Sequence, residues 1–74
     1  MMMNIPKINN YYVRDDGLVI FIENMGLTKF EFKVILPTES YKAGVHEFEW
    51  TSNIYDYKPI DYEVGKRYDK LITQ

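Results

Sequence analysis

The feature that most constrains the fold is a series of β-prone segments separated by turn residues in the first half of the chain. Tyr11–Arg14 precedes Asp15–Gly17, which can adopt the positive φ of a tight hairpin. Leu18–Ile22 is an apolar run rich in β-branched residues and is short for a buried helix. After a second turn, Thr28–Leu36 alternates between apolar and charged residues. We therefore expect an antiparallel meander of three strands.

The alternation in the third segment also predicts which side chains face the core. Successive side chains of a strand point to opposite faces of a sheet. One face of this segment is entirely apolar and should be dry, whereas the other is charged and should be wet. The dry face holds Phe30, Phe32, Val34 and Leu36, and the wet face holds Lys29, Glu31 and Lys33.

A fourth strand is expected at Val45–Trp50, because Pro37 cannot donate a ladder hydrogen bond and ends the third strand. Its residues alternate again. His46, Phe48 and Trp50 fall on one face, and Val45, Glu47 and Glu49 on the other. We expect His46, which shares this aromatic face, to pack in the core or at its edge. The two glutamates should then lie on a solvated face.

The last third of the chain is compatible with two structures. A helix beginning near Pro59 would align Ile60, Val64, Tyr68 and Leu71, but it would place Gly65 in its interior at a cost of about 1 kcal/mol. Strands would alternate over Ile60, Tyr62 and Val64, turn at Gly65, and return over residues 68–72. We favour the strands, which make Tyr62 a core residue and leave Tyr55 and Tyr57 on the surface.

Together these segments predict an all-β protein, in which an antiparallel meander of five or six short strands closes into a compact barrel or sandwich. The class becomes α+β if the C-terminal segment is helical. Residues 1–74 should form a single small domain, with residues 1–5 as a flexible N-terminal arm. The chain has no cysteine, so disulfides cannot stabilise so small a core. An aromatic core or homo-oligomerisation would compensate.

Composition argues against several functions. The net charge is −2, and residues 47–63 carry five acids against Lys58 alone, so we expect no direct nucleic-acid binding. The longest apolar run, Leu18–Ile22, is far shorter than the ~20 residues of a membrane span, which predicts a soluble, cytoplasmic protein without membrane contact. One histidine and no cysteine predict no metal site, and the scattered glycines form no phosphate-binding loop, so no cofactor is expected.

The tyrosine-rich segment after Trp50 is the best candidate binding surface. Tryptophan and tyrosine are enriched among binding hot spots, and carboxylates beside them suit a partner with a basic rim. The predicted anchors are Trp50, Tyr55 and Tyr57, and the predicted charged groups are Asp56, Asp61 and Glu63.

The chain is therefore expected to be a non-catalytic binding protein that acts by occupying a protein partner. Residues with A/T-rich codons (Phe, Tyr, Met, Ile, Asn and Lys) make up nearly half of it, a composition typical of small phage and mobile-element proteins. Inhibition of a host enzyme or defence system would fit. One alternative is a protein that sequesters a nucleotide or sugar, with Lys66, Arg67 and Lys70 near a phosphate. Another is a structural accessory of a virion or assembly.

Overall fold

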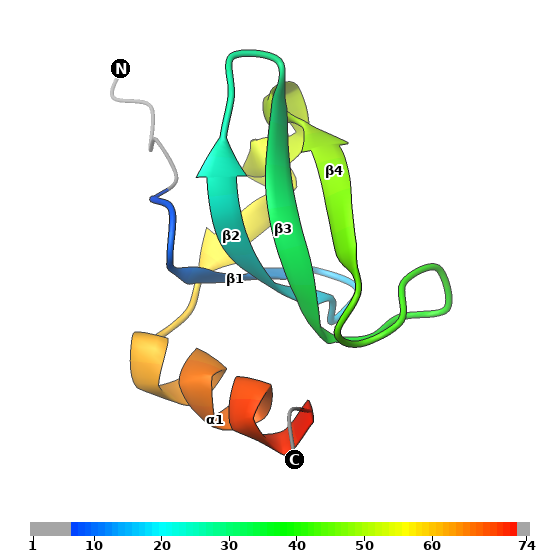
Figure 1. The fold of residues 1–74 in the computed structure, drawn as a ribbon, viewed down its shortest axis with the longest axis vertical. Coiled ribbons are helices and arrows are strands. Elements are labelled where there is room, and N and C mark those ends of the chain that lie inside the picture. Colours follow the sequence, from blue (N-terminus) through cyan, green and yellow to red (C-terminus); the bar gives the residue numbers. More distant parts are fainter. Residues whose placement is uncertain (1–6, 73–74) are drawn as a thin grey trace.

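The computed structural model describes residues 7–72, which form a five-stranded sheet with one short 3-10 helix and one α-helix (Figure 1). The elements, in chain order, are β1 (Tyr11–Arg14), β2 (Val19–Met25), β3 (Lys29–Leu36), β4 (His46–Trp50), the 3-10 helix η1 (Thr51–Asp56), β5 (Tyr57–Pro59) and α1 (Tyr62–Ile72). The predicted strands of the meander and the fourth strand are confirmed. The predicted arm, residues 1–5, lies outside the described residues.

All neighbouring strands are antiparallel, and their order is β4-β3-β2-β1-β5. The sheet bends strongly, so that β1 runs across the direction of β3 (Figure 1). It is nevertheless open: within the described chain, β4 and β5 are its two edges and do not pair. The predicted closure into a barrel, or division into two stacked sheets, is therefore wrong, and the α+β alternative describes the molecule.

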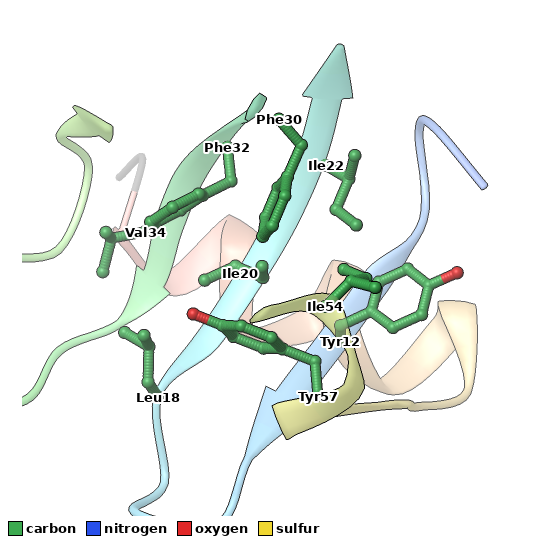
Figure 2. Close-up of a cluster of buried hydrophobic side chains, with 9 residues drawn as sticks. All are labelled: Tyr12, Leu18, Ile20, Ile22, Phe30, Phe32, Val34, Ile54 and Tyr57. Atoms are coloured by element: carbon green, nitrogen blue, oxygen red, sulfur yellow. The ribbon is translucent and has the colours of Figure 1, made fainter. Parts of the chain in front are cut away.

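The inner face of the sheet carries the larger apolar cluster (Figure 2). It contains Tyr12, Leu18, Ile20, Ile22, Phe30, Phe32, Val34, Ile54 and Tyr57. Ile54 comes from η1 and Tyr57 from β5, so the segment after β4 covers this face. Phe30, Phe32 and Val34 are at most 1% exposed, which confirms the predicted dry face for these three residues.

Leu36 does not follow that pattern. It pairs with Val19, and it packs against a second cluster on the outer face that is centred on Tyr11, Val19 and Ile35. The register between β2 and β3 shifts between Val19 and Ile20, and such an irregularity changes the side-chain alternation. The prediction that Leu36 shares a face with Phe30 is therefore wrong.

The outer cluster is covered by α1, where the sequence favoured two strands. The cluster is completed by Val13, Phe21, Leu36, Ile60, Tyr68 and Ile72, the last two from the helix itself. The Tyr11 hydroxyl donates to Asp69 Oδ2 at 3.0 Å, and Lys33 Nζ lies 3.0 Å from Asp69 Oδ1. One helical carboxylate thus binds both β1 and β3.

Gly65 lies in the interior of α1, although glycine disfavours helices, because it contacts the side chain of Tyr11 there. A Cβ atom at this position would lie 2.2 Å from Cγ of Tyr11, so only glycine lets the helix backbone rest on that ring. The Asp61 carboxylate accepts a hydrogen bond from the Glu63 N–H at 3.1 Å and caps the first turn. The prediction of strands over residues 60–72 is wrong because the close approach of Gly65 to Tyr11 outweighs its low helix propensity.

Within residues 7–72, no helix has the length and apolar character needed to cross a membrane.

Candidate functional site

The six residues predicted to bind a partner do not form one surface. Trp50 and Tyr55 are 56% and 59% exposed, and Asp56 at the end of η1 is exposed as well. Asp61 and Glu63 are also exposed but belong to the start of α1, which lies at the opposite end of the molecule from η1 and the end of β4 (Figure 1). The carboxylates of Asp61 and Glu63 are therefore separated from Trp50, Tyr55 and Asp56.

Tyr57 is a core residue, and the prediction of a surface tyrosine at this position is wrong. It is 6% exposed, and its ring packs edge-on against Phe30 with the centroids 6.0 Å apart. Burial raises the pKa of Tyr57 to about 12. Tyr62, predicted to be in the core, is 46% exposed, because it lies on the first turn of α1 rather than on a strand.

The guanidinium of Arg14 lies beside the ring of Tyr57 and is hydrogen-bonded to Asp16. Its guanidinium carbon lies 5.9 Å from the ring centroids of both Tyr41 and Tyr57. Asp16 accepts from Arg14 Nε at 2.9 Å and from the terminal nitrogen at 2.5 Å. This hydrogen-bonded pair lowers the pKa of Asp16 to about 2. Because the guanidinium is held by Asp16 within the β1–β2 hairpin and lies beside two tyrosine rings, we assign Arg14 a structural role.

The structure instead assembles an aromatic surface around Phe48 and Trp50. Both residues lie on β4 with Phe48 65% and Trp50 56% exposed, and both point to the outer face. Opposite them in register are Glu31 and Lys29 of β3. The Lys29 ammonium lies 4.9 Å from the Trp50 ring centroid, a distance at which a cation over an aromatic face is attractive. We call Lys29, Glu31, Phe48 and Trp50 the β4 surface.

An open hollow of about 220 Å³ adjoins this surface. Its lining comes from β2, β3, β4 and the turn between β2 and β3. The lining residues are Asn24, Met25, Gly26, Lys29, Glu31 and Phe48. Leu27, in the same turn, is fully exposed. The hollow therefore has an aromatic wall, and it contains both signs of charge.

The orientation of β4 is opposite to the one expected from its sequence. The shared face of His46, Phe48 and Trp50 is confirmed, but this face is the exposed one. Glu47 and Glu49 pair with Phe32 and Phe30, so they lie at the margin of the inner face and are partly buried. This orientation depends on the cross-strand register, which pairs the aromatic residues of β4 with the predicted wet face of β3.

His46 is an edge-strand residue and not a core residue. Its Nδ1 atom lies 2.6 Å from Glu23 Oε1, and its side chain is 55% exposed. Histidines held by a carboxylate can act as general bases when a nucleophile lies beside the second nitrogen. Within the described residues, no hydrogen bond links this imidazole to a hydroxyl group, and no group of three or more metal-binding side chains is found. The geometry therefore supplies a surface contact between an imidazole and a carboxylate.

Comparison of the chain with models of protein families, with curated proteins and with solved structures finds no match.

Proposed function

We propose that the protein is a non-catalytic binding domain that acts by covering part of a partner protein, and that Phe48 and Trp50 are its anchors. The observation that carries this proposal is the exposure of two large aromatic side chains on one face of one strand. Burying such rings would gain roughly 25 cal/mol per Å² of apolar area. Tryptophan is also prominent among interface hot spots.

The surroundings of these rings favour a macromolecule over a small ligand. Pockets for small molecules usually measure about 300–1,000 Å³ and enclose most of the ligand. The hollow beside Phe48 measures about 220 Å³ and is open. A protein interface needs only ~800 Å² from each partner, which a domain with 5396 Å² of accessible surface can offer. A partner held in this way would be blocked sterically, as expected of an inhibitor.

The test is capture of partners from a host lysate by the immobilised protein, followed by mass spectrometry. The informative variant carries Phe48→Thr and Trp50→Thr, because threonine retains a preference for strands. We expect this variant to remain folded and to lose the partners that the wild type captures. Leu71→Ser is the matched control: it removes another exposed apolar side chain, 68% exposed, from α1. If the double variant captures the same proteins as the wild type, the β4 surface is not the binding site.

Tyr55 and Asp56 remain predicted contacts, since both are exposed on η1 directly after β4. Tyr55→Ser tests the larger of these two contacts separately. Loss of capture by this variant would extend the interface from β4 onto η1, whereas unchanged capture would confine it to β4.

A further inference from the structure

The backbone of β4 presents an open hydrogen-bonding edge on the same strand that carries the exposed aromatic rings. The Thr51 N–H donates to the Thr28 carbonyl at 2.7 Å, and the Val34 N–H donates to the Val45 carbonyl at 2.9 Å. These bonds fix the phase of the β3–β4 ladder. Because antiparallel ladders alternate between residues that bond the neighbouring strand and residues that point away, His46, Phe48 and Trp50 point away from β3.

A side-chain contact supports this phase independently. The Trp50 N–H donates to Glu49 Oε2 at 3.2 Å and therefore does not point to β3. Trp50 also precedes the first turn of η1 as its cap. This leaves the N–H and C=O groups of His46 and Phe48 directed outward, at the margin of the molecule, with no element beside them in the described part of the chain (Figure 1). Such a row of unpaired groups is a template for an additional strand.

The opposite edge of the sheet does not offer the same opportunity. β5 has three residues and ends at Pro59, which has no N–H to donate. The Ile60 N–H that follows is bonded to the Tyr11 carbonyl at 3.1 Å. Edge pairing is therefore expected at β4 and not at β5.

The charges of β4 argue against a second copy of this chain as the added strand. In an antiparallel pair, residues directly opposite each other share a face, and like charges opposite each other are destabilising. The outward backbone groups belong to even-numbered residues, whereas both glutamates are odd-numbered. Every two-fold symmetric register that pairs Phe48 with His46, Phe48 or Trp50 of the other copy therefore places a glutamate opposite a glutamate: Glu47 against itself, Glu49 against itself, or each against the other.

We propose that the β4 edge binds an extended segment of the partner protein in which basic and apolar residues alternate. The segment adds as an antiparallel strand and forms backbone hydrogen bonds with His46 and Phe48. Its apolar residue lies against Phe48 on the outer face, and its basic residues lie opposite Glu47 and Glu49 at the inner margin. Glu47 has no ion pair or hydrogen bond within residues 7–72, so its charge is available. This inference rests on the proposed function and specifies the partner's chemistry.

The test uses two blocked seven-residue peptides, one alternating lysine with valine and one alternating glutamate with valine. Binding is followed through the amide NMR signals and hydrogen exchange of the isotope-labelled protein. We expect the lysine peptide to bind about tenfold more tightly than the glutamate peptide, because two favourable cross-strand charge pairs contribute about 1.4 kcal/mol together. Added salt should reduce the difference. The His46 and Phe48 amides should become protected from exchange, and the amides of α1 should not.

Charge reversal provides the decisive variants. Glu47→Lys together with Glu49→Lys should invert the preference and select the glutamate peptide. Glu47→Lys alone should allow two copies to pair, since each introduced charge would lie opposite Glu49 of the other copy. Dimers should then appear in sedimentation experiments. If the wild type dimerises through β4, if neither peptide protects Phe48, or if the reversed variant keeps the wild-type preference, strand addition is wrong.

Failure of strand addition would not be confused with failure of the proposed function. If the peptides do not bind but the Phe48→Thr, Trp50→Thr variant still loses its captured partners, the β4 surface binds by another geometry. If capture is also unchanged, both proposals fall.

Discussion

The two halves of the outer sheet face belong to one sheet and share β3, but they differ in what covers them. Near β1, the rings and aliphatic side chains of Tyr11, Phe21 and Ile35 are packed beneath α1. Near β4, Phe48 and Trp50 are exposed, and their neighbours on β3 are charged. On the outer face, an apolar residue is thus expected to stabilise the fold mainly where α1 lies over it. The covered half is expected to determine stability and the uncovered half to determine binding.

The sharpest test of this difference compares one residue from each half. Ile35→Ala should lower the free energy of unfolding by about 2–4 kcal/mol, because Ile35 is fully buried and its removal leaves a cavity. Phe48→Ala should change that free energy by no more than about 0.5 kcal/mol, since its ring is already mostly in water. Urea unfolding measures both. Equal losses would mean that the exposed aromatic residues also support the fold.

The contact between α1 and β1 is tested by Gly65→Ala. Alanine favours helix by about 1 kcal/mol over glycine, but its Cβ would overlap the Tyr11 side chain, and overpacking costs about 1–3 kcal/mol. We expect a net loss of up to about 2 kcal/mol in urea unfolding. Lys66→Ala, an exposed position on the same helix, is the control and should change stability by less than about 0.5 kcal/mol. A stabilised Gly65→Ala variant would show that the helix does not rest on Tyr11.

The smallest expected effect concerns alkaline pH. Burial, together with the hydrogen bond to Asp69, raises the pKa of Tyr11 above its ordinary value of 10.0. The folded state therefore keeps this phenol protonated where the unfolded chain ionises, so the stabilisation is complete below pH 10 and is lost as pH rises further. Tyr11→Phe should cost about 1 kcal/mol at neutral pH through the lost hydrogen bond.

The same variant should flatten the decline in stability above pH 10, as followed by urea unfolding at several pH values. Tyr57→Phe is the companion variant, because the pKa of Tyr57 is raised to about 12 within the inner cluster. Tyr57→Phe should remove a separate part of the decline in unfolding free energy between pH 10 and 12. If Tyr11→Phe leaves the pH dependence unchanged, the phenol of Tyr11 is not buried under α1.

The features that were predicted well from the sequence are those determined by residues close together along the chain. The alternation of Thr28–Leu36 identified the inner face as far as Val34, and Asp15–Gly17 forms the expected turn, with Gly17 at φ 92°. The errors concern relations between distant residues. The helix depends on a glycine that meets Tyr11, and the orientation of β4 depends on its register with β3. One sequence contains no direct signal for either relation.

The candidate site was predicted only in part for the same reason. Trp50 and Tyr55 are exposed as expected of anchors, but Phe48 was not among the predicted anchors, and Tyr57, which was, is buried. Alternation shows which residues share a face without showing which face α1 and η1 cover. The position of those two elements therefore decided which rings are anchors and which are core.

The hydrogen bond between Tyr11 and Asp69 also has a kinetic consequence, because it joins residues 58 positions apart. Contacts so distant in sequence carry a large loop-closure entropy and tend to form late in folding. Docking of α1 is then expected after the transition state, when the hairpins of β1, β2 and β3 already exist. Substitutions at Asp69 should accordingly accelerate unfolding while leaving the refolding rate nearly unchanged. The C-terminal helix would thus control how long the native state persists rather than how quickly it is reached.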